Sequence, residues 1–188
     1  MPPMQAPPAG LSAKGAARRR FARNGAGASA GVIATVASQN AMATLVCLAP
    51  SAACSGNMSR KSPTVACAGV SPGYWKTHHY AWRGALTNGT AKFNLTFPLT
   101  SRCSQLASYT CFDIVDPGIV TNGADKDNVA MHIMATLLNV RSKRIGFLTE
   151  NQVLAIWNSY AATGYYTPIA NTSWNGAQIV AYLKSTMA

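Results

Sequence analysis

Three histidines are the side chains of this chain most suited to chemistry. Two imidazoles with a carboxylate are a sufficient set of ligands for zinc or another divalent ion. One hypothesis is therefore a small metal-dependent hydrolase that holds zinc through its histidines. The ligands would be His78, His79 and His132, with Asp125 or Asp127 as the nearby carboxylate.

Several features favour a different interpretation of these histidines. Only 5 residues of the chain are Asp or Glu, so hydrogen-bonded core histidines are more typical of such a composition than ligands. No G-x-S-x-G elbow supplies a serine nucleophile, and the cysteine spacing fits no C-x2-C zinc knuckle. We therefore expect no catalysis and no cofactor, and keep zinc for the hydrolase alternative alone.

Residues 71–82 gather two Trp, two Tyr, two His and one Lys into a single short segment. Ser71 followed by Pro72 is typical of a helix start, because serine caps the helix and proline needs no donor there. A helix over the whole segment would place both Trp and both His on one face, so we expect the Trp pair in a small core. The candidate binding residues are Tyr74, Trp75, Lys76, His78, His79 and Trp82.

Residues 73–78, Gly-Tyr-Trp-Lys-Thr-His, resemble the G-[YF]-W-K-[NT]-H signature of a group of uncharacterised exported bacterial proteins. Residues 131–139, which begin Met-His and end Ala-Thr-Leu-Leu-Asn, are similar to a His-led helix of the same group. The chain departs from the commonest form at His79, where proline usually follows. The resemblance implies secretion and a shared small fold, and it implies no activity.

The first third of the chain is typical of an export signal. An Arg-containing region, an apolar stretch and a small-residue exit follow one another up to residue 53. We expect a targeting segment at 1–53 that is removed near Ala53, a linker at 54–70 and a single domain at 71–188. The mature protein would then be secreted, periplasmic or at the cell surface, without a transmembrane span.

The cysteines suit an exported protein. Beyond the signal-like region four remain, an even number. We expect a local disulfide between Cys103 and Cys111, whose loop is short, and a second one between Cys54 and Cys67. Such bonds persist outside the cytosol.

The remainder predicts a mainly α fold: a small irregular bundle of about four short helices, a long loop region and a disordered N-terminal segment. Helices are expected at 127–141, after Thr149 and after Asn175, since the last two carry capping boxes. Residues 84–124 are expected to form a long loop with one extended segment, because apolar residues alternate over 93–99.

The net charge and the aromatic residues limit the classes of partner that this protein is expected to bind. The net charge is +11, and from residue 54 onward eleven basic residues still face five acidic ones, which favours anionic surfaces. No nucleic-acid reader motif occurs. We therefore expect binding or assembly at a bacterial surface, with self-association, a surface polysaccharide or a protein as partner. The aromatics expected to be exposed are Tyr74, Tyr80, Tyr165, Tyr166 and Trp174.

Overall fold

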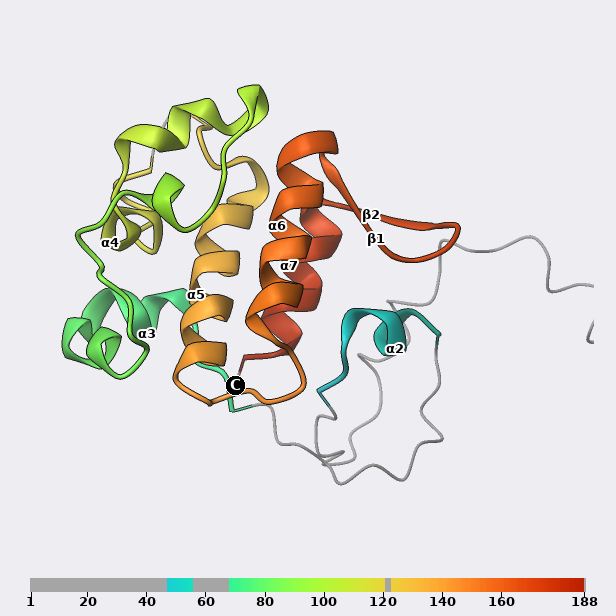
Figure 1. The fold of residues 1–188 in the computed structure, drawn as a ribbon, viewed down its shortest axis with the longest axis horizontal. Coiled ribbons are helices and arrows are strands. Elements are labelled where there is room, and N and C mark those ends of the chain that lie inside the picture. Colours follow the sequence, from blue (N-terminus) through green and yellow to red (C-terminus); the bar gives the residue numbers. More distant parts are fainter. Residues whose placement is uncertain (1–46, 56–67, 121–122, 188) are drawn as a thin grey trace, which may run out of the picture. The chain divides into compact units, whose positions relative to one another are not determined.

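The computed structural model of the protein describes residues 47–55, 68–120 and 123–187 (Figure 1). These residues are mostly helical with one small sheet, which confirms the mainly α fold class. Residues 1–46 of the targeting segment expected at 1–53, and residues 56–67 of the linker expected at 54–70, lie outside the described residues. Among the helices of the described ranges, none has the length and apolar character needed to cross a bilayer.

The elements follow in a simple order. The α-helices are α2 (Pro50–Ser55), α3 (Pro72–Thr77), α4 (Cys111–Ile114), α5 (Val129–Arg141), α6 (Glu150–Thr163) and α7 (Gly176–Ser185). Short 3-10 helices are η2 (His79–Arg83), η3 (Phe93–Leu95), η4 (Ser101–Ser108) and η5 (Lys126–Asn128). Strands β1 (Tyr165–Ile169) and β2 (Thr172–Asn175) pair antiparallel.

Helix α5 is the centre of the core. Most of its side chains are buried, and it contacts α3, α4, α6 and α7. Figure 1 shows α6 and α7 on one side of α5, with α3 and α4 on the other. A helix enclosed in this way is apolar around most of its circumference, as its sequence is.

The predicted starts of α6 and α7 are confirmed. The side chain of Thr149 accepts a hydrogen bond from the Gln152 amide, and Asn175 accepts one from Gln178 in the same way. Helix α5 begins beside Asp125, whose carboxylate oxygens accept hydrogen bonds from the Ala130 and Met131 amides at 2.8 and 2.9 Å. Each oxygen satisfies an amide that lacks a partner within its own helix.

The single helix expected over residues 71–82 is wrong. Ser71 caps α3 as predicted, but α3 ends at Thr77 and the backbone breaks at His78 (φ −116°, ψ 60°) before η2. The break turns the chain back, so that the Trp82 indole donates a 3.0 Å hydrogen bond to the Trp75 carbonyl. Both indoles are buried, as predicted, and the histidines do not share their face.

The extended segment expected over 93–99 is also wrong. The Phe97 amide donates to the Phe93 carbonyl at 3.0 Å, which closes a helical turn. Both rings are buried while Leu95 is 76% exposed. A spacing of four residues fits a helical turn as well as an alternating strand, and packing against Trp157 decided for the turn.

Neither predicted disulfide is present, because Cys54, Cys103 and Cys111 are free thiols. The residues between Cys103 and Cys111 form most of η4 instead of a closed loop. A 3-10 helix rises about 2 Å per residue, so Cys103 and Ser108 lie roughly 10 Å apart. The chain then continues extended, whereas a disulfide needs Cα atoms within about 7 Å. Cys67 lies outside the described residues.

The sequence did not reveal the hairpin of β1 and β2. In this hairpin Tyr166 pairs with Trp174, and Ile169 pairs with Thr172. Asn171 has a φ of 63° in the connection, a conformation that asparagine tolerates better than most residues. The hairpin lies beside α6 and α2.

Candidate functional site

The structure divides the candidate binding residues between core and surface. Trp75 and Trp82 are buried and belong to the core cluster. Lys76 and His79 are exposed, whereas Tyr74 and His78 are half-buried. The surface of this segment, and not its indoles, is therefore available to a ligand.

An open cleft of about 630 Å³ lies next to η2. It would admit a ligand of small-molecule size or one stretch of a polymer. Its walls come from His79, Tyr80, Trp82 and Arg83 of η2, from residues 87–90 and from Phe112 of α4.

Aromatic rings form one side of the cleft. The His79 and Phe112 rings are stacked, with centroids 4.2 Å apart, and Trp82 meets Phe112 edge-on at 4.6 Å. A Cβ atom at Gly89 would lie 2.1 Å from the Phe112 ring, so a larger residue there would displace it. The absence of a side chain at Gly89 thus lets the loop close over Phe112, whose amide donates to the Gly89 carbonyl at 2.8 Å.

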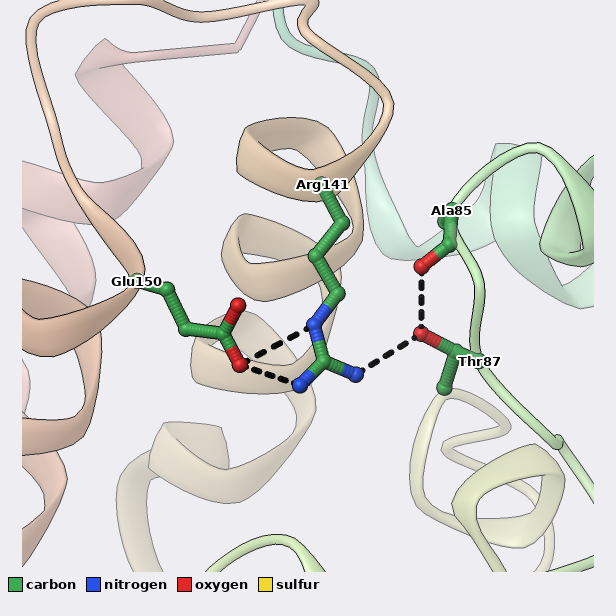
Figure 2. A network of polar contacts seen from close by, with 4 residues as sticks. All are labelled: Ala85, Thr87, Arg141 and Glu150. Atoms are coloured by element: carbon green, nitrogen blue, oxygen red, sulfur yellow. Dashed lines mark hydrogen bonds and ion pairs between the residues drawn. The ribbon is translucent and has the colours of Figure 1, made fainter.

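Arg141 of α5 anchors the loop that forms the other wall (Figure 2). Its guanidinium donates a 3.0 Å hydrogen bond to the Thr87 hydroxyl, which donates to the Ala85 carbonyl at 2.9 Å. The same guanidinium holds Glu150 through two hydrogen bonds, and this contact lowers the pKa of that carboxyl. The loop wall is thereby tied to the first turn of α6.

The cleft carries polar groups without any carboxylate. The Asn88 side-chain oxygen accepts hydrogen bonds from the Thr90 amide and hydroxyl at 3.1 and 2.8 Å. The exposed Arg83 belongs to neither ion pair found among the described residues. The lining therefore offers hydrogen-bonding side chains and one unneutralised positive charge, and it lacks the carboxylate pair of a glycosidase-type acid and base.

The first half of the segment 71–82 makes contacts within the protein, outside the cleft. The Tyr74 and His78 rings stack with centroids 4.1 Å apart. The Arg144 guanidinium lies 5.0 Å from the centre of the Tyr74 ring and donates to its hydroxyl at 3.1 Å. Lys76 pairs with Asp116 at 3.0 Å. The pKa of Asp116 is lowered by the Gly118 amide first and by Lys76 second. These contacts fix the surface beside the cleft.

Asn139 of α5 joins this helix to Val70 and Trp75, which lie before and within α3. Its side-chain oxygen accepts hydrogen bonds from the Trp75 indole at 3.2 Å and from the Val70 amide at 3.0 Å. Its side-chain nitrogen donates to the Val70 carbonyl at 2.9 Å. In the sequence, Asn139 stands out only as a polar residue near the end of an apolar helix. Such a residue is expected to be hydrogen-bonded when it is buried, and this was the one signal of its role.

The three histidines have separate partners. The Nδ1 atom of His78 lies 2.9 Å from the Tyr74 carbonyl, and that of His132 lies 2.8 Å from the Asn128 carbonyl. His132 is buried, and burial lowers its pKa. Within the ranges described above, no three His, Cys, Asp or Glu side chains gather as a metal site. The structure therefore does not bring the three proposed ligands together.

The cleft combines stacked rings, amide and hydroxyl groups and a free guanidinium on a frame fixed by α5 and α6. Such a lining suits non-covalent recognition of a polar ligand that has an apolar face. In comparisons with known proteins, the chain matches no family model, no curated protein and no solved structure.

Proposed function

We propose that the protein is exported to a bacterial cell surface or beyond and acts there by binding a surface polysaccharide. The cleft beside His79 is the proposed binding site. The observation that carries this proposal is the composition of its walls: exposed aromatic rings and an unpaired arginine, with no carboxylate.

The chemistry of a sugar ring supports this choice of ligand. A saccharide has an apolar C–H face that packs on an aromatic ring, and a rim of hydroxyls that needs hydrogen-bonding partners. His79 and the 73% exposed Tyr80 supply ring faces. Asn88 supplies an exposed amide. Arg83 favours a saccharide that carries negative charge.

Export is supported by sequence alone. The order of basic, apolar and small residues before position 54 is that of a secretory signal, and the hexapeptide resemblance points to exported bacterial proteins. Residues 1–46 of this region lie outside the described residues, and the sequence features support the proposal independently of the cleft.

Binding to purified polysaccharides tests the proposal. The full chain is titrated with oligogalacturonate and with a neutral galactose oligomer of the same length. We expect the anionic sugar to bind, and His79→Ala and Tyr80→Ala each to weaken binding about tenfold, since each removes a stacking ring. Tyr165→Ala, which removes an exposed ring on β1, is the matched control.

The charge is tested in the same titration. Arg83→Gln should lose the preference for the anionic sugar, whereas Lys126→Gln removes an exposed charge outside the cleft and should keep that preference. If Arg83→Gln and Lys126→Gln reduced the preference for the anionic sugar by the same factor, the sugar would be attracted non-specifically to the positive surface. Binding that survives the His79 and Tyr80 changes would contradict the cleft as the site.

A further inference from the structure

The short segment at residues 47–55 packs against the domain. Helix α2 contacts β1, and Figure 1 shows it below the hairpin. Cys47 and Pro50 are buried. The Tyr182 hydroxyl donates a 2.9 Å hydrogen bond to the Leu48 carbonyl, 134 residues earlier in the chain. These contacts are of the kind that stabilise a folded domain, and we name residues 47–55 the strap.

The strap lies over three aromatic side chains, which we name the aromatic face: Tyr166, Trp174 and Tyr182. Their rings form a row, with centroid distances of 6.1 Å from Tyr166 to Trp174 and 5.1 Å from Trp174 to Tyr182. The expectation that Trp174 is exposed is wrong, since Trp174 is only 7% exposed, and Tyr182 is 8% exposed. Burial raises the pKa of Tyr182 and of the Cys54 thiol, and a Trp174 hydrogen bond opposes the shift at Cys54.

We infer that the aromatic face is an interaction surface whose partner is the chain's own strap, and that the strap stays in the mature protein. A cut after Ala53 would remove the Leu48 carbonyl that Tyr182 binds and the part of α2, which contacts β1, that precedes Cys54. Exposed aromatic patches of this kind promote association. Leader removal must therefore occur before Cys47, and not near Ala53 as the small-residue pattern predicts. This inference rests on the proposed export.

The first test is the N-terminus of the exported protein. The full-length gene is expressed in a bacterial host, and the extracytoplasmic fraction is analysed by intact mass and N-terminal sequencing. We expect a mature chain that begins before Cys47. A mature chain that begins at Cys54 would overturn the inference while leaving the proposed export intact. If no protein leaves the cytosol, the proposed export fails, and the second test alone decides whether the strap is docked.

The second test is hydrogen exchange on the full chain. The Ala53 amide donates to the Ala49 carbonyl within α2, so peptides over 47–55 should exchange slowly. Tyr182→Phe keeps the ring and removes the hydrogen bond to Leu48, so exchange there should quicken on the order of fivefold. Tyr165→Phe, an exposed tyrosine of β1, should change nothing. Exchange over 47–55 at the rate of an unfolded peptide in the unaltered protein would overturn the inference.

Discussion

The Trp75 indole donates a hydrogen bond to the Asn139 side chain across 64 residues of sequence, inside the core. The same amide also holds both backbone groups of Val70. Residues 73–78 and 131–139 are therefore in direct contact through one buried side chain. Asn139 accordingly determines how the chain enters α3 and how α3 lies on α5.

Asn139→Leu should be strongly destabilising. The substitution keeps a side chain that branches at the same carbon but leaves the Trp75 indole and both Val70 backbone groups without their partner. We expect a loss of about 3 kcal/mol in the free energy of unfolding, measured by denaturant titration. Asn151→Leu, at an exposed position of α6, should cost less than about 0.5 kcal/mol. A loss at Asn139 as small as that at Asn151 would contradict this role.

Trp75→Ala should unfold the protein or bring it close to unfolding. Trp75 is fully buried beside Trp82, with ring centroids 6.3 Å apart, and removing a buried Trp costs roughly 3–5 kcal/mol. The thermal midpoint of the purified protein measures the effect. Tyr80→Ala removes an exposed ring of the same segment and should leave that midpoint nearly unchanged. If Trp75→Ala kept the midpoint and lost only sugar binding, the indole would be a ligand contact after all.

Asp125→Asn should change how stability depends on pH. Burial raises the pKa of Asp125 from 3.8 to about 6, although backbone amides of α5 oppose the shift. The folded protein therefore binds this proton more tightly than the unfolded chain, and the stabilisation present below pH 3.8 is lost as pH rises through 6.

The comparison between the two proteins isolates this effect. Relative to Asp125→Asn, the unaltered protein should lose at most about 3 kcal/mol of unfolding free energy between pH 4 and pH 7. The lowered pKa of His132 acts in the opposite direction, because its contribution is lost as pH falls, but it is common to both proteins. If the difference in unfolding free energy between the two proteins stayed constant across this pH range, the raised pKa of Asp125 would be contradicted.

Cys54, Cys103 and Cys111 should each react as thiols. When the protein is unfolded without reductant and alkylated, mass spectrometry of the peptides should find one label on each of them. In the folded protein, Cys103 and Cys111 should react slowly because both are buried, and burial raises the pKa of each thiol, that of Cys111 to about 11. Recovery of a cross-linked Cys103–Cys111 peptide would contradict the structure.

The features that could be predicted correctly from the sequence are those that depend on residues close together in the chain. The capping boxes at Thr149 and Asn175 are local signals, and both are confirmed. The burial of Trp75 and Trp82 also followed from their spacing, although the helix expected to carry them is broken at His78. That break depends on the Trp82 indole reaching back to a carbonyl, a contact that no periodicity encodes.

The cleft could be predicted only in part. His79 and Trp82 were candidates because of their residue types, but Phe112 and residues 87–90 come from the region read as a loop. Their meeting depends on Gly89 lying against the Phe112 ring and on Arg141 holding Thr87 from α5. These contacts join distant parts of the chain, and a single sequence does not show which distant parts meet.

The parallel bridge between Gly69 and Met187 has a mechanical consequence. It places the residues that lead into α3 beside those that follow α7. A tensile load applied between these two positions would act first on this bridge and on the Val70–Asn139 hydrogen bonds. The packing between the helices would bear the load only after the bridge and these hydrogen bonds had broken.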